Sequence, residues 1–194
     1  MPGDAAVKRA TYEDVLAAPE HVVAEVLFGV LHTHPRPANP HARTTTQLTA
    51  ELSGPFDRGR GGPGGWILLD EPELHLHEDI IVPDLGGWRR ERLPRIPNAP
   101  YLELAPDWAC EVLSPSTNKI DRTDKLAIYA REKVRFVWFV DPLAHTLEVL
   151  RLAQARYEIF ATHKDDEVVR AEPFDAVPLE LAVLWADVAE PDPP

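Results

Sequence analysis

A short apolar run with a single acid inside it, residues 108–113, constrains the fold more than any other stretch. The run is too short for a typical helix, and its composition favours a strand that is buried on both faces. Alternate residues of a strand share a face, so Glu111 should point to the same side as Ala109 and Leu113. A carboxylate buried there is costly unless it is paired or binds a metal ion. Glu111 at a sheet edge, or against an arginine, is the competing interpretation.

The segments on either side of this run carry further charged residues. Upstream, the apolar residues 80–82 lead into Pro83 and Asp84. Because Gly86 follows closely, a turn-forming aspartate is one interpretation of Asp84. Downstream, residues 114–117 break the strand and Asp121 is expected to cap a helix.

That helix would carry Lys125 in its first turns, with Leu126 and Tyr129 on its apolar face. Two carboxylates on adjacent strands, followed by a lysine on the next helix, would form a divalent-metal site for cutting a phosphodiester. Each residue has an ordinary structural explanation when taken alone, so the prediction depends on the combination.

Several segments together carry a resemblance to a known family. They are Pro83-Asp84, Glu111 to Thr117, Asp121-Arg122, Lys125-Leu126, Tyr129 to Arg131 and Val137 to Pro142, with Thr11 to Asp14 and Glu25 upstream of Gly29. In this order they resemble the Uma-two family of restriction endonucleases, within the PD-(D/E)XK nuclease-like superfamily. The resemblance covers nearly the whole chain, and the string from Glu111 to Thr117 is its most specific part.

The resemblance implies an α+β fold: a restriction-endonuclease-like mixed β-sheet flanked by helices, with an antiparallel N-terminal meander. It also implies that Asp84, Glu111 and the backbone carbonyl of Val112 hold Mg²⁺ or Mn²⁺, with Glu25 as a further ligand. These oxygen donors suit such hard cations. Lys125 would orient the attacking water or stabilise the transition state.

Two positions depart from the family pattern. Leu113 stands where the superfamily carries its catalytic lysine, and Lys125 on the following helix would replace it. Phe28 stands where family members commonly carry an aspartate before the glycine.

The length of 194 residues suits one domain over residues 1–194, with a tail that frays from about residue 188. No run approaches the length of a membrane span, and the N-terminus lacks a signal-peptide pattern. Cys110 is the single cysteine. We therefore expect a protein of the cytoplasm that does not enter membranes.

The formal net charge of −12 disfavours nonspecific attachment to nucleic acid. Any contact with a polyanion would therefore depend on a local basic surface and on bound metal ions. We expect four arginines that closely follow Asp84 to line the same cleft and bind phosphates: Arg89, Arg90, Arg92 and Arg95.

The remaining elements follow from local patterns. Thr11 with Asp14 indicates a helix N-terminus. The other expected elements are a hairpin over 22–27 and 30–32, a helix over 41–53, a loop over 54–65, a meander of strands over 66–70, 73–77 and 80–82, a loop over 89–100, strands over 134–140, 146–152, 156–161 and 168–169, and a closing helix over 179–185.

Two functions stay open at this point. The first is a metal-dependent endonuclease acting on DNA, working as a homodimer because duplex cutting is simplest with two symmetric sites. The second is a non-catalytic protein that keeps the same fold for partner binding or oligomerisation. Leu113 and the net charge favour the second function, whereas an intact metal site would favour the first.

Overall fold

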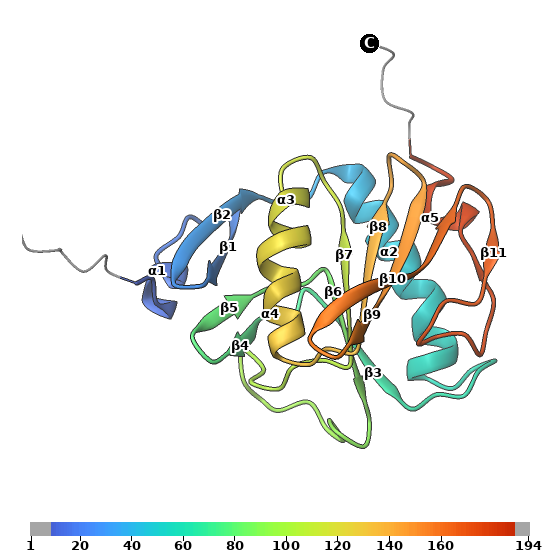
Figure 1. Ribbon diagram of the computed structural model, residues 1–194, viewed down its shortest axis with the longest axis horizontal. Helices are drawn as coiled ribbons and strands as arrows, with labels where there is room; N and C mark the ends of the chain where they lie inside the picture. The colour runs from blue at the N-terminus through green and yellow to red at the C-terminus, as the bar shows by residue number, and fades with distance from the viewer. Residues whose placement is uncertain (1–8, 189–194) are drawn as a thin grey trace, which may run out of the picture.

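A six-stranded mixed sheet forms the centre of the protein in the computed structural model, which describes residues 9–188 (Figure 1). Its strand order is β10-β9-β8-β7-β6-β3, and β7 and β8 run parallel while the other neighbours are antiparallel. The strands are β3 (Trp66–Asp70), β6 (Leu85–Arg89), β7 (Trp108–Val112), β8 (Phe136–Asp141), β9 (Thr146–Ala153) and β10 (Arg156–Lys164). This mixed sheet with flanking helices confirms the predicted fold class.

A helical crossover joins the parallel strands β7 and β8, as parallel pairing requires. It consists of α3 (Asn118–Ile120), the π-helical turn η2 (Asp121–Lys125) and α4 (Leu126–Arg131). The prediction that Asp121 caps this helix is wrong. Helical hydrogen bonding already begins when the N–H of Asn118 donates to the carbonyl of Ser114, so Asp121 lies inside the helix with a buried side chain.

A smaller antiparallel sheet lies beside this helix, on the left of Figure 1. Its order is β2-β1-β5-β4, built from β1 (Val22–Leu27), β2 (Val30–Pro35), β4 (Leu74–Leu76) and β5 (Asp79–Ile81). The predicted hairpin is confirmed, with Phe28 and Gly29 at positive φ in its turn. The predicted meander is wrong at its first strand, because β3 pairs with β6 in the larger sheet instead of with β4.

Strand β6 was not predicted, because its two glycines indicated a turn. A Cβ atom on Gly86 would lie 2.7 Å from the Trp88 ring, and one on Gly87 would lie 3.0 Å from the Trp108 ring. The glycines therefore leave room for two buried tryptophans within a strand. The chain consequently runs straight on from Asp84 to Arg89 instead of turning back.

The two faces of β7 pack into two different apolar clusters, as its alternation predicted. Trp108, Cys110 and Val112 pack with Leu48 of the helix α2 (Asn39–Leu52). Ala109 and Leu113 pack with Ile128 and Tyr129 of α4. Figure 1 shows these two helices on opposite sides of the larger sheet.

The remaining elements are short: α1 (Tyr12–Leu16), η1 (Ser53–Asp57), β11 (Val168–Val169), β12 (Leu179–Glu180) and α5 (Ala182–Trp185). The predicted cap of α1 is confirmed, since the N–H of Thr11 donates to Asp14 at 2.8 Å. The predicted loop over 54–65 is wrong at its start, where η1 continues from α2. The predicted closing helix is wrong over its first three residues, because Leu179 and Glu180 pair with β11 and α5 begins at Ala182.

No helix within residues 9–188 is long and apolar enough to span a membrane. The predicted frayed tail lies almost entirely outside the described residues.

Candidate active site

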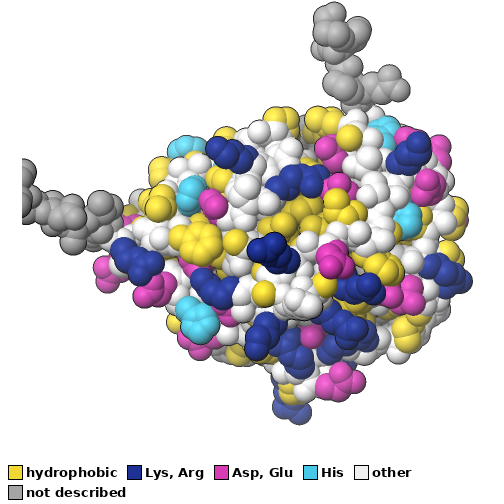
Figure 2. All heavy atoms as spheres, in the orientation of Figure 1, with side chains coloured by type: hydrophobic (Ala, Val, Ile, Leu, Met, Phe, Trp, Pro, Cys, Tyr) yellow, Lys and Arg dark blue, Asp and Glu magenta, His cyan; other side chains and the backbone are white. Residues whose placement is uncertain are grey.

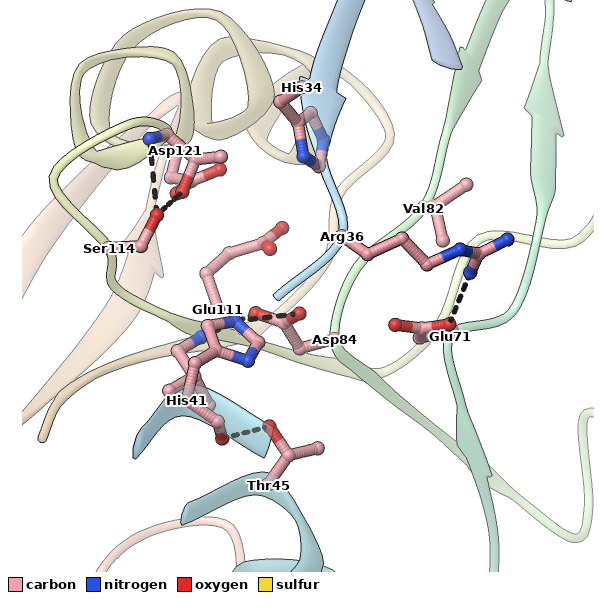
Figure 3. A network of polar contacts seen from close by, with 12 residues as sticks. His34, Arg36, His41, Thr45, Glu71, Val82, Asp84, Glu111, Ser114 and Asp121 are labelled. Carbon is pink, nitrogen blue, oxygen red and sulfur yellow. Dashed lines mark hydrogen bonds and ion pairs between the residues drawn. The ribbon is translucent and has the colours of Figure 1, made fainter. Parts of the chain in front are cut away.

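A cavity of about 260 Å³ opens where the crossover helix, the small sheet and the start of α2 meet. Four acidic residues line it, together with one lysine, one arginine and two histidines: Glu71, Asp84, Glu111, Asp121, Lys125, Arg36, His34 and His41. Figure 3 shows most of these side chains directed toward one another from different elements. The three residues predicted to be catalytic, Asp84, Glu111 and Lys125, are therefore brought to one site.

Glu111 lies in the middle of the larger sheet, on β7, and is 1% exposed. Its Oε1 accepts a hydrogen bond of 2.5 Å from the hydroxyl of Tyr129, and its Oε2 lies 3.1 Å from Lys125 Nζ. The interpretations of an edge position or an arginine partner are therefore wrong. Burial raises the pKa of Glu111 well above its ordinary range. The negative charges of Asp121 and Asp84 raise this pKa further, whereas the ammonium of Lys125 lowers it.

Lys125 is the buried cation at the centre of this group. Its Nζ lies 3.1 Å from Glu111, 3.2 Å from Glu25 and 3.5 Å from Asp121, and it donates to the Val82 carbonyl at 3.1 Å. Burial disfavours the ammonium, but the surrounding carboxylates outweigh burial and raise the pKa of Lys125 well above its ordinary value. Lys125 is therefore held charged and is not a general base at neutral pH.

Glu25 reaches the site from β1 and is also 1% exposed. Its Oε1 accepts the Val82 N–H at 2.7 Å, and its Oε2 lies 3.3 Å from His34 Nε2. Burial alone would raise the pKa of Glu25, but Lys125, His34 and the Val82 N–H together lower it. The hydrogen bond to Glu25 in turn raises the pKa of His34.

Asp84 lies immediately before β6, where its carboxylate contacts two other elements. Its Oδ2 accepts the N–H of Val112 at 2.6 Å, and its Oδ1 lies 3.1 Å from His41 Nε2 on α2. The first bond ties Asp84 to the strand that carries Glu111. The buried Nδ1 of His41 has no hydrogen-bond partner within residues 9–188.

Three contributors were not identified from the sequence: Asp121, Tyr129 and His41. Asp121 and Tyr129 lie four residues before and after Lys125, and this spacing was the available signal that they share its face of the helix. His41 gave no local signal, because α2 reaches Asp84 only through the tertiary fold.

The donor atoms at the site fit a small divalent cation. Within the described residues no three His, Cys, Asp or Glu side chains are arranged to hold a metal ion by themselves. Mg²⁺ is usually held by one or two carboxylates and keeps several waters. Asp84 and Glu111 both line the cavity and could supply those carboxylates, and Asp84 also accepts the N–H of Val112. Burial is the main cause of the raised pKa of Glu111, and the carboxylates of Asp121 and Asp84 add to it.

The arginines predicted to share this cleft do not line it. Because β6 continues as a strand, Arg89 lies about 17 Å along the chain from Asp84, at the other end of the sheet. Arg90 pairs with Asp57 at 2.5 Å and Arg92 with Asp107 at 2.8 Å. Figure 2, in the same orientation as Figure 1, shows basic side chains gathered in the lower part of the view, where the chain follows β6. The expectation of a shared cleft is therefore wrong.

The mixed sheet with its helical crossover has the fold class expected of restriction-endonuclease-like proteins. The chain belongs to the Uma2 family, described as "Putative restriction endonuclease", whose model matches residues 10–183. This confirms the resemblance seen in the sequence. No curated protein matches the chain.

A solved structure supports the fold independently. The crystal structure of "a putative nuclease belonging to DUF820" from Anabaena variabilis ATCC 29413 superposes with a TM-score of 0.72. The sequence identity is 23%, and the match covers 91% of this chain and 98% of that one. At this identity the likeness shows the fold alone.

Proposed function

We propose that the protein is a metal-dependent endonuclease that hydrolyses phosphodiester bonds in DNA, with Mg²⁺ or Mn²⁺ as its cofactor. One observation carries this proposal: two carboxylates from neighbouring strands, Asp84 and Glu111, line one cavity with a charged lysine beside them. The nuclease family of the chain gives the reaction class.

Asp84 and Glu111 would hold the cation, with the Val112 carbonyl as a main-chain ligand. A cation there would polarise the phosphate and lower the pKa of the attacking water. Tyr129 keeps one oxygen of Glu111 fixed, so that the other faces Lys125. Lys125 would stabilise the charge that develops on the phosphate, because its ammonium is already oriented by three carboxylates.

Glu25 is proposed to act one step away from the cation. Its contacts are with Lys125, His34 and the Val82 N–H, so it orients the lysine. In this proposal Glu25 is therefore not a metal ligand, as the resemblance implied, but a residue that positions Lys125.

A non-catalytic binding protein is the second candidate, and one observation favours it. Leu113, at the position of the superfamily lysine, is buried at 3% exposure in the apolar cluster beside α4 and cannot take part in chemistry. This candidate predicts that the cavity carboxylates serve only to balance Lys125.

Calorimetric titration with Mn²⁺ and a plasmid-cleavage assay separate the two candidates. Asp84→Ala should weaken Mn²⁺ binding at least tenfold and abolish cleavage. Asp107→Ala, at the other end of β6, is the matched control and should leave both unchanged. Wild-type protein that neither binds Mn²⁺ nor cleaves DNA or RNA would overturn the endonuclease proposal in favour of the binding protein.

A further inference from the structure

Among the described residues, 9–188, Arg36 is the single arginine that lines the cavity. It belongs to the three-residue link, residues 36–38, between β2 and α2. Figure 3 shows its side chain extending toward Glu71. Lys125, the other strong cation of the lining, is buried and surrounded by carboxylates. Arg36 is therefore the exposed cation of this lining, whereas Lys125 is the buried one.

The backbone that carries Arg36 has little freedom. Pro35 precedes it and Pro37 follows it. A proline fixes its own φ, and it confines the residue before it to extended conformations. The strand β2 and the helix α2 anchor the two ends of the link. The guanidinium is thus presented from a fixed point at the cavity mouth.

The guanidinium itself is held loosely. Arg36 Nη1 lies 3.9 Å from the Glu71 carboxylate, and Nη2 donates a long bond of 3.4 Å to the Glu20 carbonyl. The Arg36 side chain is 60% exposed and that of Glu71 is 40% exposed. Exposed ion pairs of this kind contribute little, so an incoming anion can replace both contacts at low cost.

We propose that Arg36 binds a backbone phosphate of the nucleic-acid strand, next to the phosphate that is cut. This inference rests on the proposed function and names the residue that holds the substrate. The acidic lining and the net charge of −12 repel a polyanion, so a strand entering the cavity needs a cation at the entrance. The planar guanidinium can donate two parallel hydrogen bonds to one phosphate.

The test measures binding of a fluorescent duplex by anisotropy across a salt series, with Ca²⁺ in place of Mg²⁺. Arg36→Ala should weaken binding several-fold and flatten the slope of log affinity against log salt by about 0.9, the effect of one phosphate contact. Arg36→Lys should keep the slope and recover only part of the affinity, because a lysine keeps the charge without the fork.

Arg43→Ala is the matched control. Arg43 lies on α2 outside the cavity lining and pairs with Asp187, so its loss changes the net charge equally. Its slope and affinity should equal those of the wild type. If the wild type binds and Arg36→Ala matches Arg43→Ala, the inference about Arg36 is overturned. If the wild type binds neither duplex nor single strands at low salt, the proposed function itself fails.

Discussion

The two ends of strand β6 place charge in opposite environments. At the Asp84 end, acids and one lysine are buried together, and the pKa of Glu111 is raised by that burial. At the Arg89 end, arginines pair with acids in partly exposed contacts, such as Arg92 with Asp107. Charge at the first end is expensive to bury and depends on the pairing of the carboxylates with Lys125. Charge at the second end is solvated and can be altered piecemeal.

Removal of the buried lysine should have the largest effect. Lys125→Met leaves Glu25, Glu111 and Asp121 without their shared cation, so the free energy of unfolding should fall by about 3–5 kcal/mol. Urea denaturation at pH 7 measures this, and cleavage should be lost. Saturating Mg²⁺ should restore part of the stability. If the free energy of unfolding fell by less than about 1 kcal/mol, the two ends of β6 would not differ as described.

The two buried glutamates should respond to pH in opposite directions. The pKa of Glu25 is lowered in the folded state, so its stabilising contribution is present above its unfolded pKa of about 4.3 and disappears as pH falls through the lower folded pKa. Glu25→Gln should therefore destabilise the protein by about 1–3 kcal/mol at pH 7, with the difference vanishing in acid.

The pKa of Glu111 is raised in the folded state, so ionisation of Glu111 reduces stability as pH rises from about 4.3 through that higher pKa. Glu111→Gln should gain stability relative to the wild type over this window, and the difference should be absent at lower pH. Thermal unfolding between pH 3 and 9 measures both variants. Parallel pH profiles for the two variants would contradict this assignment.

The arginine end should show the smallest effect. Arg90→Ala with Arg92→Ala removes two partly exposed ion pairs, each contributing about 0–1 kcal/mol. Mn²⁺ affinity should not change, because neither residue lines the cavity. The salt slope of duplex binding should also stay at the wild-type value. A slope flattened by about two units would instead show that Arg90 and Arg92 bind phosphates of the duplex.

The sequence predicted what local periodicity determines. Strand alternation assigned the faces of 108–113 correctly, because both sides of β7 are packed with apolar residues. The resemblance located Asp84, Glu111 and Lys125 in one site. The four-residue spacing of Asp121 and Lys125 could have added Asp121.

What failed depended on distant residues. Gly86 and Gly87 indicated a turn, whereas the space they leave is filled by Trp88 and Trp108, which no local pattern reveals. That one error placed Arg89, Arg90 and Arg92 at the cavity, whereas they lie near the other end of β6. His41 reaches Asp84 from a separate helix, and Arg36 acquires its position only from the meeting of β2 and α2.

The crossover helix also connects the small sheet to the larger one. Lys125 binds Glu25 and the Val82 carbonyl of the small-sheet side, and Arg131, further along the helix, binds Asp79 at 2.7 Å. These two cations clamp the small sheet to the helix at two separate points. A shift of the small sheet relative to the helix would change the distances from Lys125 Nζ to Glu25 and to the Val82 carbonyl. The position of the Lys125 ammonium in the cavity therefore depends on how the small sheet is placed relative to the larger one.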